Sequence, residues 1–163
     1  MKLKKILVPL DGSALAETVL PRVVELADVS GGTVELLCAV ESPTLPGVDP
    51  TEAQIKVVRE GETYVGQVAG RLRASGLKNV ATSVWYGPPA YAIVEAARLR
   101  KVDLIVMATH GRSGLGRLIM GSVAESVLRG TTTPILLLRV AEAPVEVPRG
   151  KGEAVPAPQI SER

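Results

Sequence analysis

Short apolar runs alternate with helical patterns along most of this chain, and that alternation limits the fold more than any other feature. Strands are predicted for the apolar runs at 3–10, 33–40, 79–86, 103–109 and 134–140. Helices are predicted between them by apolar spacing and by start and stop signals, over 13–28, 49–72, 90–100 and 122–129. This alternation predicts an α/β fold, a doubly wound parallel sheet with right-handed crossovers and helices on both faces.

Five such strands favour the order 3-2-1-4-5, which is a Rossmann-like arrangement. In sheets of this kind, ligands bind beyond the carboxyl ends of the strands, where the strand order reverses. Here the order reverses between strand 1, which ends at Pro9, and strand 4, which ends near Thr109. We therefore expect one ligand crevice between these two strand ends.

The helix over 49–72 is the least regular of the predicted helices. Asp49 and Pro50 form a typical start, with an N-cap residue followed by proline in the first turn. Gly61, Gly66 and Gly70 each weaken a helix by roughly 1 kcal/mol relative to alanine. We expect bending or mobility in this segment.

The chain of 163 residues fits one domain, predicted over 1–140. Residues 141–163 form a Pro-rich C-terminal tail, because four prolines and scattered charges interrupt any helical or strand pattern there. Such a segment is typical of disorder. Packing of the tail on a partner subunit is the alternative.

Composition excludes several function classes. Aromatic residues make up 2% of the chain and the net charge is only +2, so neither base stacking nor a basic patch favours a nucleic-acid or membrane partner. Cys38 is the single cysteine, which excludes an intrachain disulfide and argues against a cysteine zinc site. No apolar run approaches the roughly 20 residues of a transmembrane helix. We expect a cytoplasmic protein.

A glycine-rich, basic stretch follows the most apolar strand. It contains Gly111, Gly114, Gly116 and Gly121, and Arg112 and Arg117 lie among them. Backbone N–H groups of such a loop, together with a following helix N-terminus, form an anion site that suits phosphate. Neither the P-loop pattern nor G-x-G-x-x-G fits, so a dinucleotide is disfavoured. A plain flexible connection is the structural alternative.

Ser122 and Glu125 have the spacing of a capping box at the start of the last predicted helix. Ser122 would then cap the helix, and its hydroxyl could also donate to a phosphate. The sequence therefore predicts that the loop and this helix bind the same anion.

Three segments resemble the universal stress protein family, in its ATP-binding branch. The first is Gly111, nine intervening residues and then Gly121-Ser122, which is similar to the family's phosphate motif. The motif's first glycine is replaced by Ala108, whose backbone carbonyl remains available. The second is the first strand with its turn at 6–13, and the third is the ending at 121–137.

The resemblance implies a bound ATP and assigns a role to each matching residue. Gly111, Gly121, Ser122, Val123 and Ala124 would contact the phosphates. Met107 and Ala108 would lie near the ribose, and Pro9 would line the pocket. The backbone groups of Ala39 and Val40 would face the adenine edge.

Asp11 is a separate case, because a carboxylate that faced a phosphate directly would be repelled. It is expected to accept from a ribose hydroxyl or to help hold Mg²⁺, which prefers oxygen ligands. A role confined to turn formation is the structural alternative.

Three functions fit the sequence. The first is an ATP-binding stress-response regulator, in which nucleotide stabilises a conformation or oligomer that partner proteins recognise. Its homodimer or higher oligomer would form through strand 134–140, as the resemblance implies. The second is a slow ATPase or self-phosphorylating enzyme, although the loop offers no evident general base. The third is a nucleotide-free dimeric interaction module.

Overall fold

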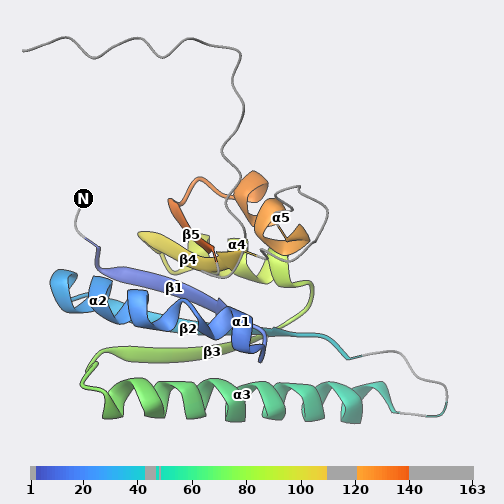
Figure 1. The fold of residues 1–163 in the computed structure, drawn as a ribbon. Helices are drawn as coiled ribbons and strands as arrows, with labels where there is room; N and C mark the ends of the chain where they lie inside the picture. Colours follow the sequence, from blue (N-terminus) through green and yellow to red (C-terminus); the bar gives the residue numbers. More distant parts are fainter. Residues whose placement is uncertain (1–2, 43–46, 48, 110–120, 140–163) are drawn as a thin grey trace, which may run out of the picture.

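The computed structural model describes residues 3–42, 47, 49–109 and 121–139. Its strands are β1 (Lys5–Leu10), β2 (Thr33–Val40), β3 (Val80–Tyr86), β4 (Leu104–Thr109) and β5 (Ile135–Arg139). Its helices are α1 (Ala14–Glu17), α2 (Leu20–Ser30), α3 (Pro50–Ala74), α4 (Pro89–Leu99) and α5 (Ser122–Gly130), as drawn in Figure 1.

The strands form a single five-stranded sheet in the order β3-β2-β1-β4-β5. All four neighbouring pairs are parallel. The predicted fold class and strand order are therefore confirmed. β1 pairs with both β2 and β4, so the order reverses at β1 and β4 as expected.

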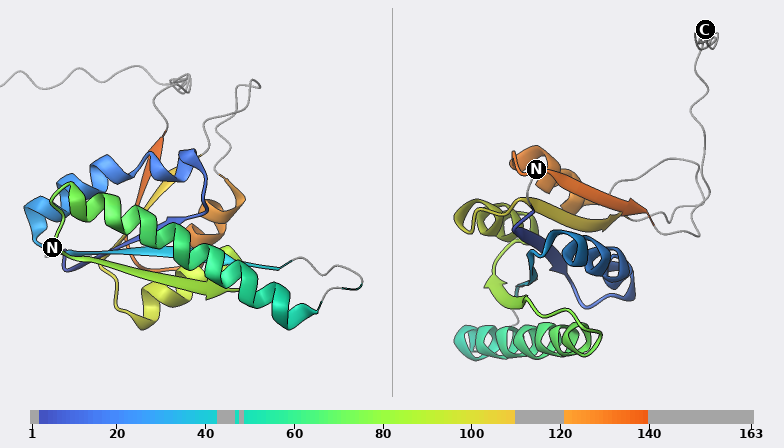
Figure 2. Two further views of the ribbon diagram at one scale, coloured as in Figure 1. Left: turned by 90° about the horizontal axis from the view of Figure 1, so that it is seen from below. Right: turned by 90° about the vertical axis from the view of Figure 1, so that its left-hand side faces the viewer.

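Helices cover both faces of the sheet and enclose two apolar cores (Figure 2). On one face, Val23 of α2 and Val65 of α3 pack against residues such as Ile6 and Leu36. On the other face, residues of α4 and α5 pack against the strands. Buried side chains on both faces explain why the strands read as continuous apolar runs.

The single helix predicted over 13–28 is wrong, because this segment forms two helices, α1 and α2. Pro21 explains the break: a proline inside a helix lacks the N–H group and clashes with the carbonyl four residues earlier, which here belongs to Glu17. Glu17 is the last residue of α1, and Pro21 lies in the first turn of α2. The clash thus ends α1 at Glu17, and a new helix begins at Leu20.

Helix α3 runs without interruption through all three of its glycines, over 25 residues. The predicted start is confirmed, because the Asp49 side chain accepts from the N–H groups of Thr51 and Glu52. Gly61 is buried, and a Cβ there would lie 3.1 Å from methyl groups of Val40 and Val84. This glycine therefore lets the helix approach β2 and β3 closely.

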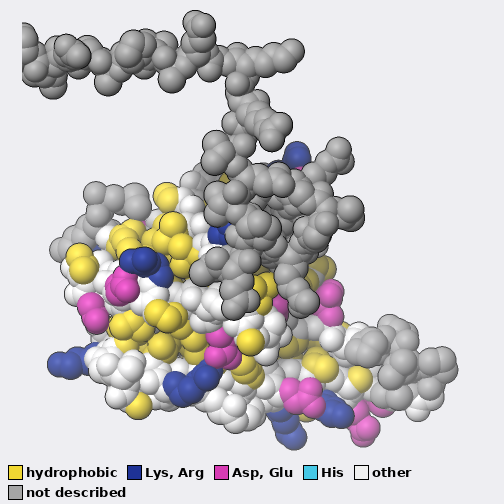
Figure 3. Space-filling view, in the orientation of Figure 1, with side chains coloured by type: hydrophobic (Ala, Val, Ile, Leu, Met, Phe, Trp, Pro, Cys, Tyr) yellow, Lys and Arg dark blue, Asp and Glu magenta, His cyan; other side chains and the backbone are white. Residues whose placement is uncertain are grey.

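The N-terminal part of α3 continues past the end of β3 (Figure 1). None of its residues before Gly61 is buried. Acidic and basic side chains are mixed along the edge of the molecule that α3 forms (Figure 3). This half of the helix is a solvated, charged surface.

β5 is the edge strand of the sheet and pairs only with β4 among the described residues. Its residues Ile135 to Leu138 are half-buried. Val140, the last residue of the predicted strand, lies outside the described residues, as does the tail over 141–163. Within the described residues, no helix has both the length and the apolar character needed to cross a bilayer.

Asp103 ties the start of β1 to the start of β4. Its Oδ2 atom accepts from the backbone N–H groups of Lys4 and Lys5, at 2.8 and 2.9 Å. These two hydrogen bonds lower the pKa of the carboxyl below its ordinary value of 3.8. Asp103 therefore stabilises the fold more when it is ionised than when it is protonated.

The sign of this effect gives a testable pH dependence. A carboxylate with a lowered folded-state pKa contributes its full stability above pH 3.8, and the contribution is lost as the pH falls through the folded-state pKa. Asp103→Asn keeps an acceptor oxygen but cannot titrate. Urea unfolding of both proteins between about pH 6 and pH 2 should show a stability difference that disappears at acid pH. A difference that stays constant with pH would contradict this role of Asp103.

Candidate functional site

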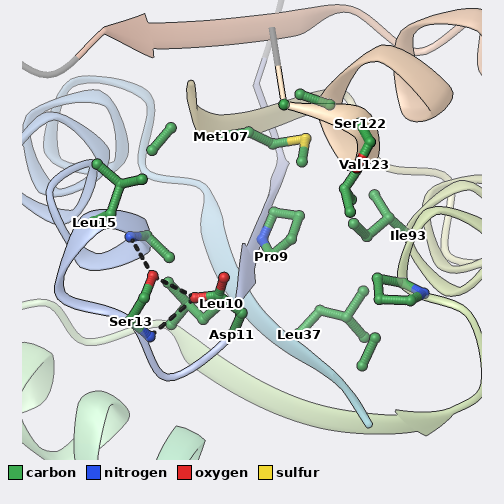
Figure 4. Close-up of a pocket in the computed structure, with 16 residues that line it drawn as sticks. Pro9, Leu10, Asp11, Ser13, Leu15, Leu37, Ile93, Met107, Ser122 and Val123 are labelled. Carbon is green, nitrogen blue, oxygen red and sulfur yellow. Dashed lines mark hydrogen bonds between the residues drawn. The ribbon is translucent and has the colours of Figure 1, made fainter. Parts of the chain in front are cut away.

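A cavity opens at the carboxyl ends of β1, β2 and β4, at the point where the strand order reverses (Figure 4). Helices α1, α4 and α5 complete its walls with residues near their N-termini. It is lined by Pro9, Leu10, Asp11, Ser13, Leu15, Ala16, Leu37, Ala39, Pro89, Ile93, Met107, Ala108, Gly121, Ser122, Val123 and Ala124. The crevice predicted from topology is therefore present.

Most of the lining is apolar. Leu37 of β2, Met107 of β4 and Ile93 of α4 belong to the core between the sheet and helices α4 and α5. The cavity thus opens directly onto the edge of that core. In Figure 4, Leu37 and Ile93 lie together on one side of Pro9, and the Asp11–Ser13 turn lies on another. An apolar floor with a few polar groups at its margin is the usual composition of a small-molecule site.

The N-terminus of α5 supplies polar groups to the cavity. The first hydrogen bond within the helix runs from the N–H of Glu125 to the carbonyl of Gly121, at 2.9 Å. The N–H groups of Ser122, Val123 and Ala124 therefore have no acceptor within the helix. All three residues line the cavity. N–H groups that have no acceptor within the helix, together with the helix dipole, favour an anion there.

The predicted capping box is wrong. Gly121 is the N-cap residue and Ser122 is the first helical residue, and no side chain caps the helix. Glu125 instead receives two hydrogen bonds from Arg129 one turn later, at 2.9 and 3.2 Å. Because Ser122 does not serve as the cap and its side chain is exposed, its hydroxyl can turn toward a ligand.

Asp11 belongs to a tight turn between β1 and α1. Its Oδ1 atom accepts from the backbone N–H of Ser13 at 2.9 Å and from the Ser13 hydroxyl at 2.6 Å. The Ser13 oxygen in turn accepts from the N–H of Ala16 at 3.1 Å and caps α1. The turn is thus held through one carboxylate oxygen, while both Asp11 and Ser13 line the cavity.

The backbone N–H and C=O groups of Ala39 and Val40 point to opposite sides of β2. In a strand, successive residues direct their N–H and C=O groups to opposite sides. The Val40 carbonyl accepts from Gly87, beyond the end of β3, at 2.9 Å. The backbone groups of Ala39 therefore point toward β1, which ends at Leu10, opposite Cys38. Ala39 lines the cavity, whereas Val40 is not among the lining residues and its side chain packs against the core beneath α3.

Nine of the eleven predicted site residues line this one cavity. They are Pro9, Asp11, Ala39, Met107, Ala108, Gly121, Ser122, Val123 and Ala124. Val40 does not line it, and Gly111 lies outside the described residues. The sequence reasoning missed Leu10, Ser13, Leu15, Ala16, Leu37, Pro89 and Ile93. Leu37 could have been found, because it shares a strand face with Ala39.

Asp11 is the one acidic side chain on the cavity wall among the described residues, and these contain no group of three or more residues suited to hold a metal ion. Cys38 lies on the opposite strand face from Leu37 and is buried. Burial, and next the negative charge of Asp11, raise the pKa of the Cys38 thiol. The thiol therefore stays protonated at neutral pH and is a poor nucleophile.

Comparison with known proteins places the chain in a family. Residues 2–139 match the model of the universal stress protein family. The universal stress protein MJ0531 of Methanocaldococcus jannaschii is 32% identical over 141 residues, which cover 83% of this chain and 82% of that protein.

Two similar solved structures were determined with nucleotides. A universal stress protein in complex with cAMP is 22% identical and has a TM-score of 0.67, covering 85% of this chain and 98% of that one. The universal stress protein of Archaeoglobus fulgidus in complex with dAMP is 18% identical and has a TM-score of 0.58, covering 84% and 98%. At these identities the two structures support the fold. The family match over residues 2–139 decides the assignment: the chain belongs to the universal stress protein family.

Proposed function

We propose that this protein binds ATP in the cavity at the ends of β1 and β4, and that the bound nucleotide stabilises a conformation or oligomer that partner proteins recognise. The observation that carries the proposal is the cavity itself. It joins an apolar floor to the open N-terminus of α5 at the point where the strand order reverses.

The lining suits the three parts of a nucleotide. Leu37, Pro89 and Ile93 offer apolar surface to the base, and Ala39 offers backbone groups that point toward the end of β1. The first turn of α5 would hold phosphate through its N–H groups and the Ser122 hydroxyl. The complexes of two related proteins with cAMP and with dAMP support a nucleotide as the class of ligand.

Asp11 would contact the ribose or a magnesium ion. Its Oδ1 atom is engaged by Ser13, which leaves Oδ2 to accept from a ribose hydroxyl or to bind Mg²⁺. Asp11 is the one carboxylate on the wall among the described residues, so most oxygen ligands of the magnesium ion would come from the phosphates. The single engaged carboxylate also offers little for general-base catalysis, which favours a regulator over an ATPase.

Assembly through β5 is part of the same proposal. The side of an edge strand that faces away from its neighbour, here β4, can form backbone hydrogen bonds with a second copy of the chain. The half-buried residues of β5 support a homodimer through this strand. Its bounds in the structure are Ile135–Arg139, within the segment 134–140 predicted for the interface.

Release of nucleotide on denaturation tests the proposal directly. The purified protein is denatured, and the supernatant is analysed by mass spectrometry for adenine nucleotides. In parallel, thermal unfolding is followed with and without Mg-ATP. A ligand present at 100 times its Kd should stabilise the fold by about 2.7 kcal/mol. No released nucleotide and no stabilisation would instead favour a nucleotide-free interaction module.

A further inference from the structure

A polar cluster joins helix α3 to helix α1, beside the cavity but outside its lining. The Tyr64 hydroxyl of α3 donates to Oε1 of Glu17 at 3.0 Å. Arg71, two turns further along α3, donates to Oε2 of the same carboxylate at 2.6 Å. The α1 clamp, defined as Tyr64, Arg71 and Glu17, thus uses both oxygens of Glu17.

Helix α1 has little other anchorage. It has only four residues, and none of them is buried. Its N-terminus is held by the Ser13 cap, and the N–H of Glu17 donates back to the Ser13 carbonyl at 3.3 Å. Its contact with the core is limited to the half-buried Ala16, so the position of this helix also depends on polar contacts such as those of Glu17.

The clamp is directly connected to the turn that carries Asp11. Ser13 contacts the Asp11 carboxylate through both its N–H and its hydroxyl, and it contacts Glu17 through its carbonyl. Gly12 lies between Asp11 and Ser13 with a φ of +82°, a conformation that side chains rarely adopt. Movement of Glu17 would therefore move Ser13 and the Asp11 carboxylate with it.

The protonation of Tyr64 fits this arrangement. Burial, and next the hydrogen bond and negative charge of Glu17, raise the pKa of Tyr64 far above its ordinary value, while a hydrogen bond from the Gly12 backbone opposes the rise. The phenol therefore stays protonated and donates to Glu17.

We propose that the α1 clamp positions the Asp11–Ser13 turn and so sets how well the site recognises the ribose hydroxyls of a nucleotide. Tyr64, Glu17 and Arg71 are positioning residues, because none of them lines the cavity. The part of the proposal that concerns ribose rests on the proposed function. The part that concerns the turn does not.

Tyr64→Phe tests the proposal, because the ring stays packed against the core while the hydroxyl is removed. The Kd for Mg-ATP should rise about threefold to tenfold, which is the effect of losing one ordinary hydrogen bond. The Kd for Mg-2′,3′-dideoxy-ATP, which lacks the hydroxyls that Asp11 would accept from, should hardly change. Isothermal titration calorimetry measures both. Glu17→Gln, which keeps the shape of the side chain, should have the same selective effect, with a higher Kd for Mg-ATP and little change for Mg-2′,3′-dideoxy-ATP.

Tyr91→Phe is the matched control, since Tyr91 lies on α4 and is 64% exposed. It should leave both dissociation constants unchanged. If Tyr64→Phe weakens the two nucleotides equally, the clamp acts only on general stability and the proposed role in ribose recognition is overturned.

Amide hydrogen exchange tests the clamp without any ligand. In Tyr64→Phe, the amides of Ser13 and Ala16 should exchange about tenfold faster than in the parent protein, while that of Leu36 in β2 should not change. Unchanged exchange at Ser13 and Ala16 would overturn the positioning role even if ATP binds. If the parent protein binds no nucleotide, the proposed function fails, and the exchange rates still decide whether the clamp holds the turn.

Discussion

Ala39→Leu is expected to weaken nucleotide binding by roughly 100-fold and to leave the fold intact. The Ala39 side chain lies on the same face of β2 as Leu37 and lines the cavity. Three additional carbon atoms would occupy the space proposed for the base, and overpacking of this kind weakens binding by roughly 100-fold. Because the added atoms enter a cavity rather than a packed core, the free energy of unfolding should change little.

Two measurements and one control variant check this expectation. Calorimetry with Mg-ATP gives the affinity, and urea unfolding gives the stability. Ala53→Leu makes the same change on the solvated half of α3, away from the cavity, and should leave binding unchanged. ATP binding by Ala39→Leu at parental affinity would place the base elsewhere.

Arg100→Ala is expected to destabilise the fold by about 3 kcal/mol, at the lower end of the cost of breaking a buried ion pair. Glu35 on β2 is 6% exposed, and it pairs with Arg100 at the C-terminus of α4. It also accepts from the Ser83 hydroxyl at 3.2 Å. Without Arg100, the carboxylate would keep only that neutral partner. The lower end applies because the Arg100 side chain is 36% exposed, so water screens part of the interaction.

Neutralising the partner should recover most of this loss. In the double variant Glu35→Gln with Arg100→Ala, no buried charge is left unpaired, and the amide oxygen can still accept from Ser83. Urea unfolding of the parent, both single variants and the double variant completes a double-mutant cycle. A loss below about 1 kcal/mol for Arg100→Ala would show that water reaches Glu35 and replaces the guanidinium.

The fold was predictable because the same sequence pattern, an apolar run between helical patterns, recurs along the chain. Each strand is an apolar run between helical patterns, and a parallel sheet of such units has few possible topologies. The break between α1 and α2 was also readable from the sequence, since Pro21 excludes a helical carbonyl at Glu17. Apolar spacing alone concealed it, because Leu15, Val19 and Val23 keep a helical period across the break.

The site residues that lie at the ends of strands were predictable from the sequence, and the other site residues were less so. Pro9, Ala39 and Met107 lie at the carboxyl ends of neighbouring parallel strands, so the sheet brings them together. Pro89 and Ile93 join them only because of how the α4 crossover packs, which no local pattern encodes.

The first turn of α5 shows a second limit of sequence patterns. The spacing of Ser122 and Glu125 matches a capping box, but the same residues fit a helix whose N-cap lies one residue earlier, at Gly121. Glu125 then lies one residue beyond the N3 position that a capping box requires, and it pairs with Arg129 one turn later. A pattern of two residues could not distinguish these starts.

The most direct test of the proposed nucleotide site is an amide NMR titration with Mg-ATP. At saturation, the largest shift changes should fall at Asp11, Ala39 and Ala108 and in the first turn of α5, from Ser122 to Ala124. The solvated half of α3 should not respond. Saturating Mg-ATP that leaves the cavity residues unchanged, or that shifts only residues of α3, would contradict the nucleotide site.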